Sequence, residues 1–155
     1  MIPFCDGGIL TIRDILKEDK KIFMEMAEAF YSSDAVSHNL DVKTVEANFD
    51  AAVNRSPFIR ALIIEDGTGP VGFAFISFTH ATEAGGLTVL LEDLYLNESC
   101  RGKGLGSKFI NFVEQEYHTA KRFRLEVAKE NTRAIELYKK LGYEELDYVQ
   151  MVKEK

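Results

Sequence analysis

The sequence predicts an α/β fold in which helices flank a mixed, largely antiparallel sheet. Apolar runs of strand length occupy residues 58–65, 71–79 and 87–96, and the stretches between them are rich in turn-forming residues, which favours an antiparallel meander. A helical repeat over 105–118 then separates the third run from another strand at 123–128. Because a strand, a crossover helix and a strand in this order give a parallel pair, we expect the sheet to be mixed.

The chain before the meander supplies one strand and two helices. Residues 9–15 alternate loosely and are rich in β-branched residues, which predicts a first strand. Apolar side chains then recur at helical spacing over 18–31 and again over 40–55, so that each helix has one apolar face. His38 and Asn39 fall in the loop between these helices, where they either line a substrate pocket or are solvated, and we favour solvation.

Two turns fix where the meander reverses. Residues 66–70 read Asp-Gly-Thr-Gly-Pro and residues 81–86 end in Gly-Gly, so both contain the residue types that tight turns need. The strand between them carries Phe73, Phe75 and Phe78, which we expect to lie in the core.

The C-terminal part of the chain predicts a helix and then a last strand or hairpin. Asn131 opens the helix and Gly142 is placed to cap its end. The helix carries one apolar stripe, made of Ala134, Leu137, Tyr138 and Leu141. Residues 143–153 are rich in aromatic and β-branched side chains, which favours a strand.

The composition is that of one globular domain without a nucleic-acid or membrane partner. The chain has 155 residues, of which 46% are hydrophobic and 28% are charged. Its net charge of -6 and pI of about 5.1 argue against binding to a nucleic-acid backbone, which needs a basic face. No run approaches the ~18 apolar residues that a membrane helix requires.

Cysteine and histidine usage predicts a cytoplasmic protein without a metal. Cys5 and Cys100 form no metal or redox motif, and two cysteines are too few to stabilise a domain of this size by disulfide cross-links. His38, His80 and His118 are scattered without paired ligand spacing, so we expect no metal site.

A glycine-rich loop joins the apolar run 87–96 to the helix over 105–118. It reads Cys100-Arg101-Gly102-Lys103-Gly104-Leu105-Gly106-Ser107-Lys108. Glycines at alternate positions bring bare N–H groups close to a ligand, and the following helix offers its positive end. The loop matches neither the Walker nor the Rossmann fingerprint. It predicts an anion site, with phosphate the favoured ligand; the alternative is a turn that binds nothing.

Three features in register carry a family resemblance. They are Glu92-Asp93-Leu94-Tyr95-Leu96 on a strand, the loop Arg101-x-x-Gly104-x-Gly106, and Asn131-x-x-Ala134-x-x-x-Tyr138-x-x-x-Gly142-Tyr143 on a helix. In this order and spacing they resemble the GNAT acyl-CoA N-acyltransferase superfamily, over nearly the whole chain. The resemblance implies a GNAT-like sheet with a splayed parallel strand pair at the CoA site, and acetyl-CoA as cosubstrate.

The resemblance also implies which residues hold CoA. The N–H groups of Gly102 to Ser107 would cradle the pyrophosphate without a metal. Backbone groups at Leu94 and Leu96, freed by the splay, would pair with the pantetheine amides, and an N–H near Leu94 or Tyr95 would stabilise the oxyanion. The implied cofactor-binding residues are Leu94, Tyr95, Leu96, Arg101, Gly102, Lys103, Gly104, Leu105, Gly106, Ser107 and Asn131.

A base and an acid follow from the same resemblance. Glu92, alternating with leucines on one strand face, is the candidate base, directly or through water; the alternative is an ion pair at the sheet surface. Asp93, expected to point the opposite way, would bind the amine or serve structure. Tyr138 matches the acid that protonates the leaving CoA thiolate, whereas without the family it is the aromatic member of an apolar stripe.

The acidic strand resembles most the diamine or polyamine N-acetyltransferase branch, and its charge suits a polycation. Our leading hypothesis is direct transfer of an acetyl group to a primary amine. The alternatives are a non-catalytic acyl-CoA sensor and acetylation of a protein N-terminus or lysine. Family members often pair through a strand near the C-terminus, which implies a homodimer.

Overall fold

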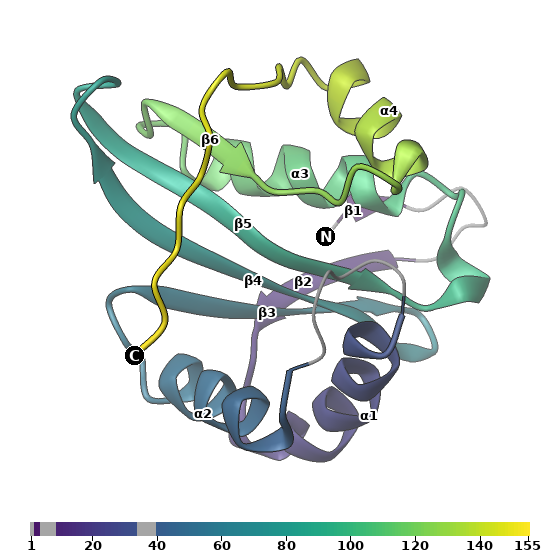
Figure 1. The fold of residues 1–155 in the computed structure, drawn as a ribbon. Helices are drawn as coiled ribbons and strands as arrows, with labels where there is room; N and C mark the ends of the chain where they lie inside the picture. The colour runs from purple at the N-terminus through teal and green to yellow at the C-terminus, as the bar shows by residue number, and fades with distance from the viewer. Residues whose placement is uncertain (1, 4–8, 34–39) are drawn as a thin grey trace.

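The computed structural model describes residues 2–3, 9–33 and 40–155, and in it the strands form one sheet in the order β1-β2-β3-β4-β5-β6 (Figure 1). The strands are β1 (Ile2–Pro3), β2 (Ile9–Asp14), β3 (Ile59–Asp66), β4 (Gly69–Ala81), β5 (Gly86–Leu96) and β6 (Arg122–Leu125). Neighbours pair antiparallel up to β5, and β5 pairs parallel with β6. The prediction of a mixed, largely antiparallel sheet is therefore confirmed.

Helices cover both faces of the sheet. They are η1 (Lys17–Asp19), α1 (Lys20–Tyr31), α2 (Val42–Val53), η2 (Glu98–Cys100), α3 (Leu105–Glu116) and α4 (Thr132–Lys140). Figure 1 shows α1 and α2 below the sheet and α3 and α4 above it. The predicted helices are all present with shifted ends, whereas β1 and the two short 3-10 helices had no counterpart in the sequence prediction.

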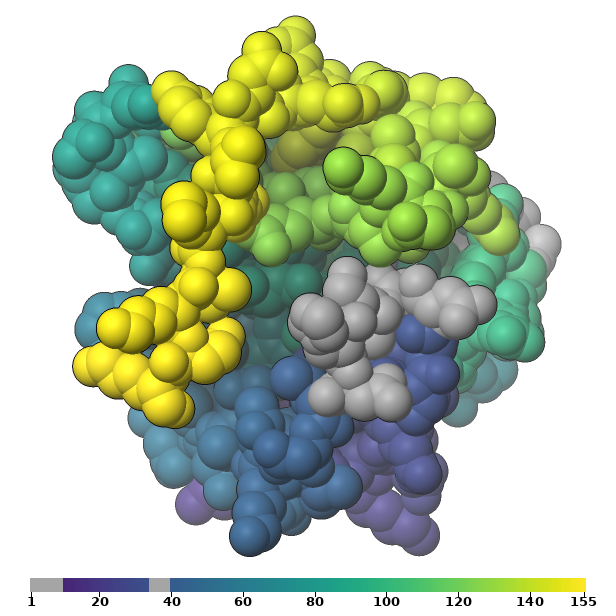
Figure 2. All heavy atoms as spheres, viewed as in Figure 1, coloured from purple at the N-terminus to yellow at the C-terminus, as the bar shows by residue number. Residues whose placement is uncertain are grey.

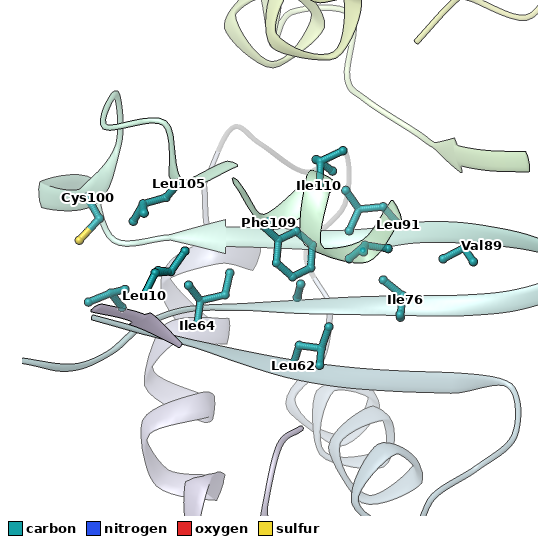
Figure 3. Close-up of a cluster of buried hydrophobic side chains, with 13 residues drawn as sticks. Leu10, Leu62, Ile64, Ile76, Val89, Leu91, Cys100, Leu105, Phe109 and Ile110 are labelled. Atoms are coloured by element: carbon teal, nitrogen blue, oxygen red, sulfur yellow. The ribbon is translucent and has the colours of Figure 1, made fainter. Parts of the chain in front are cut away.

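Two apolar cores hold these layers together, one on each face. Above the sheet, Phe109 of α3 is fully buried among side chains of β3, β4 and β5 (Figure 3). Below the sheet, the ring of Phe23 in α1 lies 5.1 Å from that of Phe73 and 5.7 Å from that of Phe75. Phe73 and Phe75 are thus core residues, as predicted, while Phe78 is only partly buried.

A one-residue bulge interrupts the pairing of β4 with β5. Phe75 lies opposite Asp93, but its neighbour Ile76 lies opposite Leu91, so Glu92 is an extra residue on β5. The parallel pairing of β5 with β6 also ends at Leu91. Beyond the bulge, β5 continues to Leu96 while β6 has ended, which gives the splayed strand pair implied by the resemblance.

The C-terminal residues correct one prediction. Residues 143–155 have no regular secondary structure, although a strand or hairpin was expected over 143–153. They run past the β4–β5 turn, where Tyr148 Oη donates a hydrogen bond to Glu83 Oε1 at 3.0 Å (Figures 1 and 2). The exposed fractions of Val149 and Met151 are 91% and 94%. The expectation was wrong because strand formation depends on a pairing partner, which composition does not supply.

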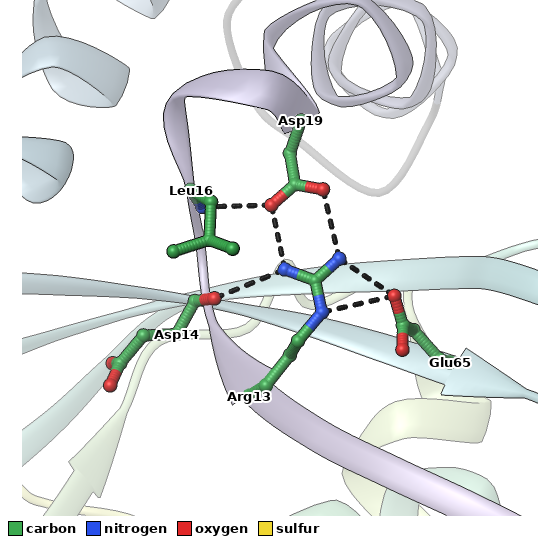
Figure 4. A network of polar contacts seen from close by, with 5 residues as sticks. All are labelled: Arg13, Asp14, Leu16, Asp19 and Glu65. Atoms are coloured by element: carbon green, nitrogen blue, oxygen red, sulfur yellow. Dashed lines mark hydrogen bonds and ion pairs between the residues drawn. The ribbon is translucent and has the colours of Figure 1, made fainter.

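A buried carboxylate, Asp19, ties the start of α1 to the sheet (Figure 4). Its Oδ2 accepts hydrogen bonds from Arg13 Nη1 and from the backbone N of Leu16, both at 2.7 Å. Arg13, on β2, also donates Nε and Nη2 to Glu65 of β3, at 3.0 and 2.7 Å. The hydrogen bonds from Arg13 hold the pKa of Asp19 below its ordinary value. This network fixes the direction in which α1 leaves the sheet.

We predict that Asp19→Ala lowers the free energy of unfolding by about 2–3 kcal/mol at pH 7, because Arg13 and the Leu16 N–H lose a buried acceptor. Urea denaturation measures the change. Since the pKa of Asp19 is lowered in the fold, this stabilisation is present above the unfolded-state pKa and disappears as the pH falls through the folded-state pKa.

The control is Glu46→Ala, which removes the exposed ion pair between Glu46 and Lys20, whose N···O distance is 3.2 Å. Exposed pairs of this kind are worth less than about 1 kcal/mol. Equal losses in the two variants would contradict the role assigned to Asp19.

Candidate functional site

The glycine loop presents bare N–H groups at the start of α3. Gly102 and Gly104 have φ angles of 79° and 77°, in the left-handed region that glycine adopts without strain. Gly104 is the N-cap of α3 and no side chain caps this end, so the first N–H groups of the helix have no intrahelical or side-chain acceptor. The loop and the positive end of α3 can therefore bind an anion.

Helix α4 packs directly against this loop. A Cβ on Gly106 would lie 3.1 Å from Leu137 Cδ2, and a Cβ on Gly102 would lie 3.1 Å from Arg133 Nη2. A side chain at either position would meet α4 at a tight distance, and the positive φ of Gly102 also favours glycine there. The contact brings the helix that carries Asn131 and Tyr138 to the side of the anion site.

Arg101, the first residue of the loop motif, turns its side chain back toward β5. Its Nε donates a hydrogen bond to the Leu96 carbonyl at 3.0 Å, and its Nη1 lies 4.0 Å from Glu98 Oε1. The side chain therefore fastens the loop to the end of β5, and the peptide N–H groups are left as the principal anion donors.

The free edge of β5 lies between the bulge and this loop. Asn97 N donates to Val71 O of β4 at 2.8 Å, and N–H and C=O groups alternate sides along a strand. The backbone groups of Leu94 and Leu96 therefore point away from β4, toward the side that β6 does not reach. By the same alternation the Tyr95 N–H points to β4, so of the two N–H groups predicted for the oxyanion contact only that of Leu94 faces away from β4.

The bulge places Glu92 and Asp93 on the same face of the sheet, against the prediction that they point opposite ways. Ser77 Oγ donates a hydrogen bond to Glu92 Oε1, and Asp93 lies opposite Phe75 in the register. Ser77 and Phe75 are two residues apart on β4 and so share a face. The extra residue shifts the alternation of side chains between the two faces of β5 by one position. Leu94 therefore packs on the α3 side of the sheet, on the opposite face from Glu92.

Asp93 is anchored from the helix below the sheet. Tyr31, the last residue of α1, donates its hydroxyl to Asp93 Oδ2 at 2.6 Å. Burial raises the pKa of Asp93, the Tyr31 hydrogen bond opposes the shift, and the charge of Glu92 adds to it. No lysine, arginine or histidine in the described part of the chain forms an ion pair with Glu92 or Asp93. The pair can therefore accept a cation from solution.

The sequence did not reveal Tyr31 and Ser77 as members of this group. Tyr31 ends an amphipathic helix, and its side chain is 5% exposed, so the sequence pattern indicates only a core residue. The hydrogen bond from its hydroxyl to Asp93 becomes visible only in the structure. Ser77 sits on a strand with no motif around it. Both residues contact the carboxylates that the bulge brings to one face, and a hydrophobic pattern does not reveal a bulge.

Asn131 and Tyr138 lie at the two ends of α4. Asn131 is the N-cap, and its Oδ1 accepts a hydrogen bond from Ala134 N at 3.2 Å. Tyr138 is partly buried against the upper core, with its ring centroid 5.9 Å from that of Tyr143. Burial raises the pKa of Tyr138, so its hydroxyl stays protonated at neutral pH.

The remaining sequence candidates lie elsewhere. Cys100 is buried in the upper core, which is the position of a structural residue rather than a reactive thiol. Residues 2–3, 9–33 and 40–155 contain no cluster of three potential metal ligands and no helix able to span a membrane. Cys5, His38 and Asn39 lie outside the described residues.

Comparison with known proteins places this geometry in a family. The model of the acetyltransferase (GNAT) family matches residues 19–143. Thialysine N-epsilon-acetyltransferase of Bos taurus is 30% identical over 136 residues, covering 81% of this chain and 76% of the bovine protein. The Mus musculus protein of the same name is 29% identical over 145 residues, covering 87% of this chain and 84% of its own.

A solved structure gives the same fold. Aminoglycoside N-acetyltransferase AAC(6')-Iy in complex with CoA superposes with a TM-score of 0.77 at 18% identity, covering 100% of this chain and 99% of the other. At this identity the likeness concerns the fold, and it extends over every layer described above.

We predict that Asp93→Asn raises the free energy of unfolding at pH 7. Because the pKa of Asp93 is raised in the fold, its ionisation costs stability above the unfolded-state pKa, and the cost vanishes as the pH falls below that value. An amide oxygen keeps the hydrogen bond from Tyr31. Urea denaturation at pH 7 and pH 4 measures the difference, which should shrink at the lower pH. A loss of stability at pH 7 would show that Asp93 is a structural anchor instead.

Proposed function

The chain belongs to the acetyltransferase (GNAT) family and is an acetyl-CoA-dependent N-acetyltransferase, and we propose that its acceptor is a small di- or polyamine. The observation that carries the proposal is the pair of carboxylates at the bulge, which share one face and have no protein cation beside them. A molecule with two ammonium groups suits such a pair better than a neutral or singly charged acceptor.

The relatives support an acceptor of this class. Both are named for the ε-amine of thialysine, which is an aliphatic primary amine on a small molecule. The net charge of -6 further favours a cationic acceptor over an anionic one.

The donor would bind along the loop and the free edge of β5. In this proposal the N–H groups of Gly102 to Ser107 hold the pyrophosphate of CoA, aided by the positive end of α3. The backbone groups of Leu94 and the N–H of Leu96 pair with the pantetheine amides, because the Leu96 carbonyl accepts from Arg101. The thioester carbonyl then lies near the bulge, where the Leu94 N–H stabilises its oxygen as it becomes negative.

Glu92 would prepare the acceptor for attack. An aliphatic ammonium has a pKa near ~10.4, so a proton must leave before the nitrogen can react at neutral pH. Glu92 is exposed and has one oxygen held by Ser77, which leaves the other to take this proton directly or through water. Asp93, anchored by Tyr31, would hold the second ammonium group of the acceptor.

Tyr138 would complete the reaction. The amine nitrogen attacks the thioester carbon, the carbon–sulfur bond breaks, and CoA leaves as a thiolate that takes a proton from the tyrosine hydroxyl. The raised pKa of Tyr138 keeps this proton available at neutral pH.

An acceptor panel monitored by CoA release tests the proposal. Spermidine, putrescine and thialysine should give kcat/KM values at least about tenfold above butylamine and short peptides. Preference for peptides would instead identify a protein acetyltransferase. Binding of acetyl-CoA without CoA release on any amine would identify a sensor.

A second copy of the chain is the proposed protein partner. The outer edge of β6 has no strand neighbour in the described sheet, and an unpaired edge is a template for another chain. Nearby, the C-terminal residues leave apolar side chains in water that a second copy would cover. These are Leu146, Tyr148, Val149, Met151 and Val152. The cytoplasmic location stays a prediction from the sequence.

We predict that Tyr138→Phe lowers kcat by about 100-fold, because the leaving thiolate loses its proton donor. The Kd for CoA, measured by calorimetry, should not change. Tyr143→Phe is the matched control, because it removes a neighbouring hydroxyl that bonds to Glu114 at 3.3 Å. Full turnover by Tyr138→Phe would contradict the assignment of Tyr138 as the general acid.

We predict that the double variant Val149→Lys with Met151→Lys is monomeric where the unmodified chain is dimeric, because two charges would enter an apolar contact. Sedimentation velocity measures the association. Tyr148→Phe, which removes only the hydrogen bond to Glu83, should remain dimeric. A monomeric unmodified chain would refute the proposed partner.

A further inference from the structure

Arg101, the cation that opens the glycine loop motif, is directed elsewhere. Arg101 donates to the Leu96 carbonyl and lies near Glu98. Lys103 is close enough to Asp66 that its charge, after the hydrogen bonds from Thr68, helps to lower the pKa of that carboxyl. The side chain of Arg101 is therefore committed outside the anion site.

Arg133, in the first turn of α4, lies beside the site instead. Its Nη2 is 3.1 Å from the position that a Cβ on Gly102 would occupy, so the guanidinium sits over the backbone of the loop. The residue is exposed and has no hydrogen-bond or ion-pair partner in the described part of the chain. Asn131 caps the same turn and so fixes where Arg133 emerges.

We propose that Arg133 is a side-chain ligand of the CoA pyrophosphate, an inference that rests on CoA binding at the loop. A guanidinium is planar and donates two parallel hydrogen bonds to a pair of phosphate oxygens. The N–H groups of the loop approach the pyrophosphate from one side, and Arg133 closes over it from α4. The site then has a full positive charge to match the phosphates, in addition to the partial charge of the helix end.

The position of Arg133 favours the pyrophosphate of CoA over the 3'-phosphate. Arg133 lies over Gly102, whose N–H belongs to the cradle that receives the pyrophosphate, and not at a separate point along α3. A phosphate seated on the loop N–H groups would lie within reach of the guanidinium as well.

Calorimetry with the full chain tests the inference. Arg133→Gln should weaken the binding of CoA about tenfold, as expected for one charge-assisted contact, and should weaken 3'-dephospho-CoA by the same factor. Arg133→Lys keeps the charge without the planar fork and should recover part of the loss. Lys140→Gln, an exposed cation at the far end of α4, is the control and should bind both ligands like the unmodified chain.

Two results would overturn the inference. Equal CoA affinity in Arg133→Gln and Lys140→Gln would show that Arg133 does not touch the ligand, and a loss seen with CoA but not with 3'-dephospho-CoA would assign it to the 3'-phosphate. Failure of the unmodified chain to bind CoA would refute the donor site itself, which is a separate outcome.

Discussion

The extra residue at Glu92 is the constraint on which the site depends. It lies where the pairing of β5 with β6 stops, so the strand runs on from the bulge to Leu96 with one edge free. The same residue shifts the side-chain alternation of β5, which brings two carboxylates to one face. One irregularity in one strand thus produces both a free strand edge and an acidic face, which we propose for the donor and the acceptor.

The rest of the fold keeps this irregularity in place. Apolar cores on both faces fix β4 and β5, so the bulge cannot slide without moving buried side chains across the sheet. Arg101 fastens the loop to the last carbonyl of β5, and Tyr31 holds Asp93 from below. The Asp19 network sets the course of α1 and therefore the place at which Tyr31 arrives.

The sequence predicted the elements of the fold better than it predicted the geometry between them. Apolar periodicity located the helices and the meander, and the glycine loop and the Asn131 to Tyr143 motif identified the family. Periodicity assumes an unbroken alternation, so it placed Asp93 on the wrong face. Tyr31 belongs to no motif and Arg133 fills an unspecified position of one, and each acquires its neighbour through packing between elements distant in the chain. The expected C-terminal strand is absent because a strand needs a pairing partner, which the composition of residues 143–153 does not specify.

Amide hydrogen exchange at Leu94 and Leu96 tests the central claim most directly. Without CoA, both N–H groups should exchange rapidly, whereas that of Val89, which lies in the parallel ladder with β6, should be protected. Saturating CoA should protect Leu94 and Leu96 and leave Val89 unchanged. Protection of both leucines in the free protein, or no change on adding CoA, would contradict the view that the bulge frees this edge for the donor.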